Sequence, residues 1–288
     1  MAFQYSVFTV MMPEFDISES AALLRDCGYE GVEWRVHSVP SPFPVKPDFW
    51  RSNKSTIDIE TIVEKAPEVR KISEDAGLKI IGLGTYISYR RPDDVAKCMA
   101  AASEMGCPSI RVSPPNYDGS VNYNDLFEES LDGYAQVENL ARDFGVRANI
   151  ELHHGNICPS ASLAHRLVCN FDPDFIGVIL DPGNMICEGF ENWQLGLELL
   201  GPYLSHVHVK NTAWTKEAAS ENGETRWKHT AARLKDGCVN WSEVLSILHR
   251  SGYRGWLSFE DFTPTDTKTK LQDNIQYIKL LTNRLGLQ

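Results

Sequence analysis

Short runs of mostly apolar residues alternate along this chain with longer segments in which apolar residues recur every three or four positions. The short runs predict strands, because a strand buried on both faces reads as a nearly continuous hydrophobic stretch. Most of them follow a glycine-containing turn of the kind that ends a helix. The predicted strands span residues 5–10, 31–36, 79–84, 109–113, 147–152, 177–181, 206–210 and 256–260.

The longer segments predict helices at residues 19–26, 59–75, 92–104, 123–143, 161–169, 193–200, 241–250 and 267–285. Strands that alternate with helices run parallel and are joined by right-handed crossovers, and eight such units close into a barrel. We therefore expect an α/β protein, with a single (β/α)8 TIM barrel domain over residues 1–288. An open doubly wound sheet is the alternative, but neither G-x-G-x-x-G nor G-x-x-x-x-G-K-[ST] occurs.

Two connections are longer than a barrel needs, and both follow the carboxyl ends of predicted strands, the second and the seventh. Residues 37–58 contain four prolines and three aromatic residues, and residues 211–239 mix aromatic and cationic residues. Long loops at this rim of a barrel are more often functional than idle. We expect these extended loops to cover a pocket, with surface decoration or a subunit contact as the other interpretation.

Charge and composition narrow the classes of partner. The 288 residues carry a net charge of −11, which disfavours nucleic acid as a partner and leaves small neutral or carbonyl compounds. The seven cysteines form no C-x-x-C pair and do not suggest a disulfide framework. The first residues have neither the basic nor the apolar region of a signal peptide, and no apolar stretch of membrane-spanning length occurs. We expect a cytoplasmic protein with no membrane partner, and leave open a homo-oligomer.

Four of the predicted strands end on side chains that bind metal ions. These are Glu151, Asp181, His208 and Glu260, from the fifth to the eighth strand. Because these strand ends lie along one arc of a barrel rim, the sequence predicts one divalent-metal site there. Three carboxylates and one imidazole suit Mn²⁺ best, with Mg²⁺, Co²⁺ or Zn²⁺ as alternatives. Each carboxylate taken alone could equally be a helix cap or a salt-bridge partner.

Two neighbours of His208 share its orientation, because side chains alternate with a period of two along a strand. His206 lies deeper and is expected to support the ligands or to be a hydrogen-bonded core histidine. Lys210 could place its ammonium group against a substrate oxygen, or be a solvated loop lysine.

Several longer motifs resemble the xylose-isomerase-like barrel superfamily of sugar isomerases and epimerases. They are Ile-Glu-Leu-His-His-Gly at 150–155, Leu-Asp-Pro-Gly-Asn at 180–184, His-Val-His-Val-Lys-Asn at 206–211, Asp-Gly-Cys-Val-Asn-Trp at 236–241, Gly-Tyr-Arg-Gly-Trp-Leu-Ser-Phe-Glu at 252–260, and Gly-Tyr-Glu-Gly-Val-Glu at 28–33. The resemblance implies that Glu151, Asp181, His208 and Glu260 bind the metal. In ketose 3-epimerases of this superfamily, the two glutamates also exchange a proton at one substrate carbon while the metal stabilises an enediolate.

The chain departs from those epimerases at the sugar-recognition positions. The epimerases have a glutamate six residues after the first ligand, a histidine three after the aspartate and an arginine six after the histidine. Here these positions hold Ile157, Asn184 and Trp214. The departure makes a plain ketohexose 3-epimerase doubtful and leaves other side chains as the sources of polar contact. The expected substrate-binding residues are His153, Asn184, Lys210, Trp214 and Arg226.

The predicted activity is a metal-dependent isomerisation or epimerisation of a sugar or keto-sugar by proton transfer next to a carbonyl group. Its expected catalytic residues are Glu151, Glu260 and His154, the last because a neutral imidazole near pH 7 suits proton abstraction. A hydrogen-bonding role is the alternative for His154. The second candidate is a metal-dependent lyase on the same scaffold, such as an inosose-type dehydratase or an eliminase of 3-keto-glycosides or C-glycosides. Phosphodiester cleavage is disfavoured, because the negative net charge of the chain repels a nucleic-acid backbone. A non-catalytic sugar-binding module is a further alternative.

Overall fold

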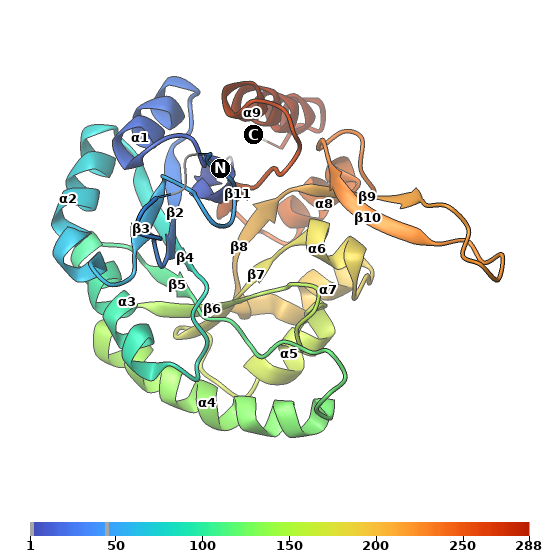
Figure 1. The fold of residues 1–288 in the computed structure, drawn as a ribbon, viewed down its shortest axis with the longest axis horizontal. Coiled ribbons are helices and arrows are strands. Elements are labelled where there is room, and N and C mark those ends of the chain that lie inside the picture. The colour runs from blue at the N-terminus through green and yellow to red at the C-terminus, as the bar shows by residue number, and fades with distance from the viewer. Residues whose placement is uncertain (1–2, 44–45, 288) are drawn as a thin grey trace.

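The strands of the computed structural model, which describes residues 3–43 and 46–287, form a nine-stranded sheet that closes on itself. The order is β1-β11-β8-β7-β6-β5-β4-β2-β3, and parallel pairing of β1 with β2 closes the first eight of these strands into the barrel (Figure 1). The predicted (β/α)8 barrel is confirmed. Its strands are β1 Gln4–Phe8, β2 Gly31–His37, β4 Lys79–Thr85, β5 Ser109–Arg111, β6 Arg147–Glu151, β7 Ile176–Leu180, β8 Leu204–Val209 and β11 Trp256–Phe259.

Helices cover the outside of the barrel (Figure 1). Asp16 and Glu19 cap the first helix reciprocally, and Gly106 and Gly145 end two others at φ values of 66° and 65°. Glycine adopts this left-handed conformation without the steric cost of a Cβ atom. The helices are α1 Ile17–Asp26, α2 Ile62–Asp75, α3 Pro92–Met105, α4 Tyr123–Phe144, α5 Ala161–Val168, α6 Pro182–Cys187, α7 Trp193–Leu200, α8 Trp241–Arg250 and α9 Thr267–Arg284, with 3-10 turns η1 Thr9–Met11 and η2 Gly201–Tyr203.

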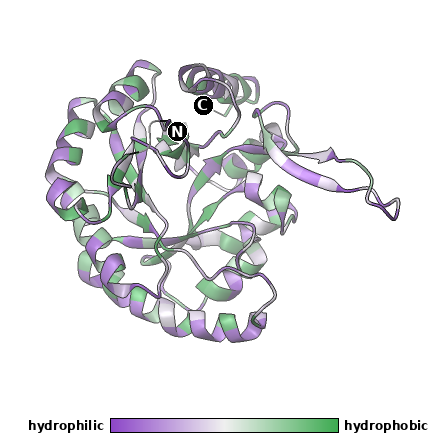
Figure 2. Cartoon of the chain, in the orientation of Figure 1, coloured by the Kyte–Doolittle hydropathy of each residue, from purple (hydrophilic) through white to green (hydrophobic). Residues whose placement is uncertain are grey.

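The two long connections are partly ordered as strands, which the sequence pattern did not predict. Strand β3, Thr56–Asp58, extends the sheet beside β2, and residues 44 and 45 of the loop before it lie outside the described residues. After β8, the antiparallel strands β9, Asn211–Lys216, and β10, Trp227–Ala232, form a hairpin. The hairpin projects away from the barrel (Figure 1) and is largely hydrophilic (Figure 2). Without an apolar face, it has no alternating hydrophobic signal.

The loop before β3 is tied to the barrel rim by hydrogen bonds. The amide of Asn53 donates to the carbonyl oxygen of Val10 at 2.8 Å, and the hydroxyl of Ser55 donates to the carbonyl oxygen of Thr9 at 2.7 Å. Arg35, from β2, donates to the carbonyl oxygen of Trp50 at 2.8 Å. These bonds hold Trp50 at the carboxyl ends of the strands.

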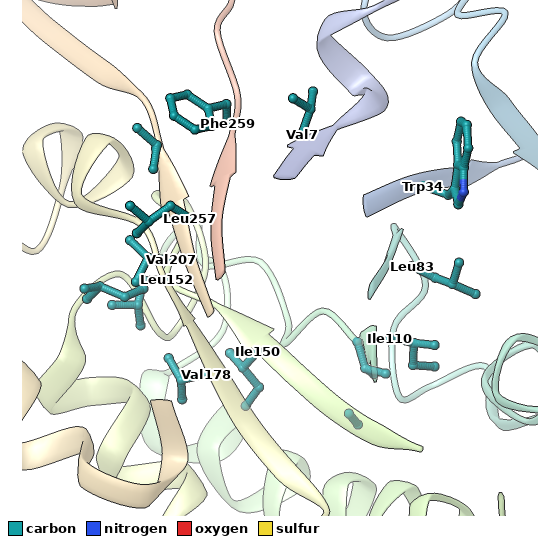
Figure 3. Close-up of a cluster of buried hydrophobic side chains, with 14 of the residues drawn as sticks. Val7, Trp34, Leu83, Ile110, Ile150, Leu152, Val178, Val207, Leu257 and Phe259 are labelled. Atoms are coloured by element: carbon teal, nitrogen blue, oxygen red, sulfur yellow. The ribbon is translucent and has the colours of Figure 1, made fainter. Parts of the chain in front are cut away.

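The barrel strands place apolar and polar side chains on opposite faces, as a period of two requires. The apolar side chains meet the helices and form a core that includes Val7, Trp34, Ile150, Val207, Leu257 and Phe259 (Figure 3). Their sequence neighbours Glu33, Glu151, His208 and Ser258 are also buried but contact one another across the barrel. The barrel interior therefore holds charged groups, which are costly to bury unless they are paired or bind a metal.

The close approach of an aromatic ring inside the barrel requires glycine at position 84. A Cβ atom at Gly84 would lie 2.2 Å from the ring of Phe8. The ring of Phe8 in turn stacks on the imidazole of His208, with 5.8 Å between centroids. Gly84 thus makes room for the aromatic side chain that packs against a predicted metal ligand.

Within the described residues, no helix is both long enough and apolar enough to cross a membrane. The seven cysteines are all free, in agreement with the expected absence of a disulfide framework.

Candidate metal and active site

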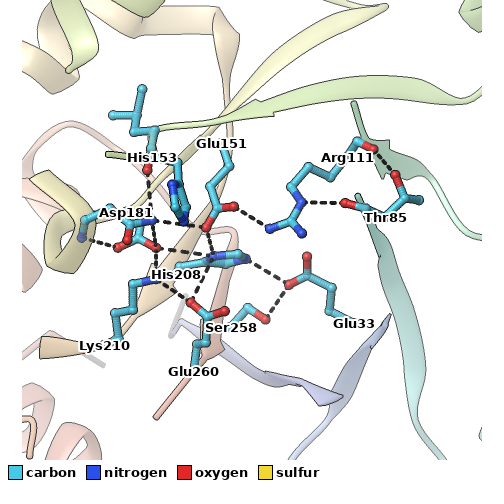
Figure 4. Close-up of polar contacts among 12 residues, drawn as sticks. Glu33, Thr85, Arg111, Glu151, His153, Asp181, His208, Lys210, Ser258 and Glu260 are labelled. Atoms are coloured by element: carbon cyan, nitrogen blue, oxygen red, sulfur yellow. Dashed lines mark hydrogen bonds and ion pairs between the residues drawn. The ribbon is translucent and has the colours of Figure 1, made fainter. Parts of the chain in front are cut away.

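The four predicted metal ligands come together at the carboxyl ends of neighbouring strands. Glu151 is the last residue of β6, Asp181 directly follows β7, His208 lies in β8 and Glu260 directly follows β11. One ligand atom from each residue lies within 4.8 Å of the others, and all four side chains are buried. A convergence of this kind requires the barrel to bring four sequence-distant strand ends to one point (Figure 4).

The imidazole of His208 is the centre of the cluster. Its Nδ1 atom lies 3.0 Å from Oε1 of Glu151, 3.5 Å from Oδ2 of Asp181 and 3.9 Å from Oε2 of Glu260. Asp181 has a second local role, because its Oδ1 accepts the backbone N–H of Asn184 at 2.8 Å and caps α6. The cap orients the carboxylate so that its other oxygen faces the cluster.

Two cations lie directly against these carboxylates. Lys210 donates from Nζ to Oε2 of Glu260 at 2.6 Å and lies 2.9 Å from Oδ2 of Asp181, and Arg111 donates to Glu151 (Figure 4). Burial lowers the pKa of Lys210, but the charges of Asp181 and Glu260 raise it above its ordinary value. Lys210 is therefore an ammonium group in the site and not a solvated loop lysine.

The two glutamates differ in their electrostatic surroundings. Burial tends to raise the pKa of Glu151, yet Arg111 and His208 hold it well below its ordinary value. Burial also raises the pKa of Glu260, and Lys210 and His208 only partly oppose that shift. Carboxyl groups whose pKa values are pushed apart are suited to different roles in acid–base chemistry.

Glu33 holds the far side of the His208 ring. Its carboxylate is 1% exposed, and Oε2 lies 3.1 Å from Nε2 of His208 and 3.4 Å from Nε2 of His206. The hydroxyl of Ser258 donates to the same oxygen at 2.7 Å. Burial raises the pKa of Glu33, but the two histidines hold it well below its ordinary value. A carboxylate bonded to Nε2 leaves Nδ1 of His208 directed at the other ligands, so His206 and Glu33 support the ligands rather than substrate.

The donor set fits a divalent ion. Glu33, Glu151, Asp181 and Glu260 bring four carboxylates together, while the permanent cations in direct contact with them are Arg111 and Lys210. A divalent ion bound by the four predicted ligands would offset this excess of negative charge, and three oxygens with one nitrogen suit Mn²⁺, Mg²⁺, Co²⁺ or Zn²⁺.

A cavity of about 430 Å³ opens over the cluster. It is lined by Glu151 and Glu260 and by four further residues that the sequence predicted for the site, namely His153, His154, Asn184 and Lys210. The amide of Asn184 donates to Oδ2 of Asp181 at 2.9 Å and to Oε1 of Glu151 at 3.3 Å. Asn184 therefore braces two ligands while it faces the cavity.

The paired histidines stack on each other. The rings of His153 and His154 lie 4.4 Å apart, and the ring of His229, from β10, meets His154 edge-on at 5.2 Å. Burial lowers the pKa of His154, and the nearby His153 and Lys210 lower it further. His154 is therefore a neutral base near pH 7, as general-base chemistry would require.

The structure does not bring Trp214 and Arg226 into this cavity. The indole N–H of Trp214 donates to the carbonyl oxygen of Ile186 at 2.9 Å, which fixes the ring against α6. Arg226 is exposed and lies just before β10, in the projecting part of the hairpin. Of the hairpin, only its base lines the cavity, through Asn211 and Thr212 of β9 and His229 to Ala232 of β10. Of the loop that we expected to cover the pocket, only the base of the hairpin does so, because the antiparallel pairing directs the remainder outward.

An aromatic wall that the sequence motifs did not specify completes the cavity. Trp50, Tyr86 and Phe262 line it, and the rings of Trp50 and Phe262 lie 4.9 Å apart. Trp50 is 53% exposed although its ring borders the site. Its place in the long loop after the second strand was the available signal, whereas nothing in the sequence pattern marked Tyr86 or Phe262.

Comparison with known proteins agrees with this geometry. The family model described as xylose isomerase-like TIM barrel matches residues 21–281. The chain belongs to this xylose isomerase-like TIM barrel family. Among curated members, an inosose dehydratase 2 from Bacillus cereus (strain ZK / E33L) is 27% identical over 142 residues, a match that spans 46% of each chain.

Solved structures share the barrel over nearly the whole chain. The apo form of a 3-keto-D-glucoside 4-epimerase from E. coli superposes with a TM-score of 0.72 at 15% identity, covering 96% of this chain and 99% of that one. The IOLI protein, solved with a bound zinc atom, gives a TM-score of 0.72 at 14% identity, covering 98% and 97%. At such low identity the likeness establishes the fold of this family member and not its reaction.

Proposed function

We propose that this xylose isomerase-like barrel is a divalent-metal-dependent isomerase or epimerase that moves a proton next to the carbonyl group of a sugar or keto-sugar. The observation that carries the proposal is the convergence of Glu151, Asp181, His208 and Glu260 at the base of a cavity that both glutamates line. Such a site offers a metal and two proton-transfer groups to one bound molecule.

The residues of the chain then have distinct tasks. Glu151, held ionised by Arg111, is the base that removes a proton from carbon, and Glu260, whose pKa is raised, is the group that holds and returns a proton. A bound divalent ion would polarise the substrate carbonyl oxygen. Lys210 adds a positive charge beside the same carboxylates and can donate to a substrate oxygen.

The donor chemistry supports the choice of metal that we propose. An aspartate, two glutamates and a histidine favour Mn²⁺ or Mg²⁺ over ions that prefer thiolate ligands. Zn²⁺ is an alternative, since the structurally similar IOLI protein holds zinc. Equilibrium dialysis with each ion, followed by elemental analysis, should find one ion per chain, and Asp181→Asn should weaken its binding.

The reaction can be tested by exchange with solvent deuterium. Metal-loaded protein is incubated in D₂O with a panel of ketoses, inososes and 3-keto-glycosides, and each sugar is examined by NMR and mass spectrometry. An isomerase or epimerase should introduce deuterium at one carbon and leave the carbon skeleton and substituents complete. If no sugar of the panel gains deuterium while the protein holds its metal, proton transfer next to a carbonyl is not its activity.

A metal-dependent lyase is the second candidate, and His154 is the observation that favours it. An elimination begins with the same proton abstraction but expels a neighbouring group, which needs a further acid–base residue near the leaving group. His154 lies three residues after Glu151 and lines the cavity without being one of the four predicted ligands, and the curated relative from Bacillus cereus is named a dehydratase. In the D₂O experiment, loss of water or of an alcohol from the substrate would identify the lyase.

A further inference from the structure

A second cavity borders the metal-site cavity. Its volume is about 420 Å³, and four residues, Tyr86, Arg111, Glu151 and His153, line both cavities. The proposed base Glu151 thus lies at their boundary. Each cavity lies in the lower half of the roughly 300–1,000 Å³ typical of small-molecule sites. Together they offer much more room than one sugar ring occupies.

The second cavity has a different chemical character from the first. Its own walls come from the loops after β4, β5 and β6, and their uncharged polar members are Ser88, Ser113, Asn116 and Asn156. Hydroxyl and amide side chains can both donate and accept hydrogen bonds, as the hydroxyl groups of a sugar do. The wall therefore suits a group rich in neutral hydroxyls.

The cations of this second cavity are already neutralised. Arg90 donates two hydrogen bonds to the carboxylate of Glu129, both at 2.6 Å. Arg111 donates to Glu151 and, at 2.8 Å, to the carbonyl oxygen of Thr85. A phosphate or carboxylate group would have to compete with these paired carboxylates. An uncharged occupant is favoured over an anion.

The first cavity is where the reacting ring fits. Glu151 and Glu260 both line it, and the aromatic side chains of Trp50, Tyr86 and Phe262 form part of its wall. Aromatic faces pack well against the C–H groups of a sugar ring. If the reacting ring lies in the first cavity, a substrate with a second part can extend past Glu151 into the polar cavity. A substrate of one ring would leave the polar cavity empty.

We propose that the substrate is a neutral two-part sugar, such as a keto-disaccharide or a glycoside with a polyhydroxylated second group, that spans both cavities. The reacting keto ring occupies the metal-site cavity, and the second group bonds to the serine and asparagine side chains of the polar cavity. This assignment rests on the proposed function for the position of the reacting ring, but the second binding site can be tested without any reaction.

The test is calorimetric binding of neutral disaccharides, their 3-keto derivatives and the component monosaccharides to Mn²⁺-loaded protein. At least one disaccharide should bind about tenfold or more tightly than either component. The double variant Ser113→Ala, Asn116→Ala should bring that ratio close to one, since each neutral hydrogen bond lost costs about fivefold in affinity. Asn124→Ala, an exposed asparagine of α4 that lines neither cavity, is the matched control and should keep the ratio.

The assignment is overturned if no disaccharide binds more tightly than its monosaccharides, or if the double variant keeps the preference of the wild type. Deuterium uptake separates this result from the proposed function. A disaccharide preference that depends on Ser113 and Asn116, in a protein that exchanges no deuterium into any keto-sugar, would retain the second binding site and reject the proton-transfer activity.

Discussion

Replacing Glu33 by glutamine should weaken metal binding although Glu33 is not one of the four predicted ligands. Oε2 of Glu33 lies 3.1 Å from Nε2 of His208 and accepts the hydroxyl of Ser258 at 2.7 Å, so the carboxylate fixes which imidazole nitrogen faces the metal. The Glu33→Gln side chain keeps the shape but loses the charge that makes the imidazole a better ligand. Changes at such outer partners typically lower metal affinity by about 10- to 100-fold.

The effect on thermal stability follows from mass action. With metal at about 100 times its dissociation constant, binding stabilises the folded wild type by about 2.7 kcal/mol, and the same metal would stabilise Glu33→Gln by only about 0.4–1.4 kcal/mol. The unfolding entropy is about 2.1 cal/mol/K per residue. For 288 residues this is about 0.6 kcal/mol/K. The metal-induced rise in Tm should therefore fall from about 4–5 °C to about 1–2 °C.

The assay is differential scanning calorimetry of each variant with and without Mn²⁺, together with chelator competition for the affinity itself. The comparison of the two scans within one variant removes any direct effect of the substitution on folding. Glu64→Gln, an exposed residue of α2, removes the same charge at the surface and should keep the full shift. Ser258→Ala should give a smaller loss. A metal-induced shift in Glu33→Gln equal to that of the wild type would refute the role assigned to Glu33.

Three further predictions concern the chemistry of the cavity. Glu151→Gln and Glu260→Gln should each retain some metal yet lose turnover by roughly 10² to 10⁴, the usual contribution of a positioned acid or base; turnover within a few-fold of wild type in both would remove them from the mechanism. The pKa of His154 is lowered, so its NMR titration should have a midpoint below 6.5; because the unfolded chain takes up this proton first, folding stability should fall as the pH drops through 6.5, and less so in His154→Gln. Deleting residues 217–226 should leave metal affinity and KM unchanged, whereas His229→Ala, at the hairpin base, should raise KM; a higher KM in the deletion variant would show that the outer part of the hairpin contacts substrate.

The pattern of apolar residues was sufficient to determine the barrel. A strand such as β7, Ile176–Leu180, is apolar throughout because helices cover one side of it and the barrel interior the other, and its residue types therefore indicate that burial directly. The same pattern identified Asp181 and Glu260 as candidate ligands, since a carboxylate is unusual at the end of an apolar strand. Sequence alone thus predicted the fold and the residues that could bind a metal.

Which side chains hold those ligands in place is determined only when the barrel closes. Glu33 and His208 are 175 positions apart, and no local spacing relates them, so their contact depends on β1, β2 and β11 closing the circle. In the same way, Trp214 had the spacing of a recognition residue from His208. Antiparallel pairing of β9 with β10 nevertheless carries it against α6, because a hairpin sets side-chain direction by its register and not by its distance from a ligand. Local pattern therefore identifies which groups could act, and tertiary packing selects which of them face one another.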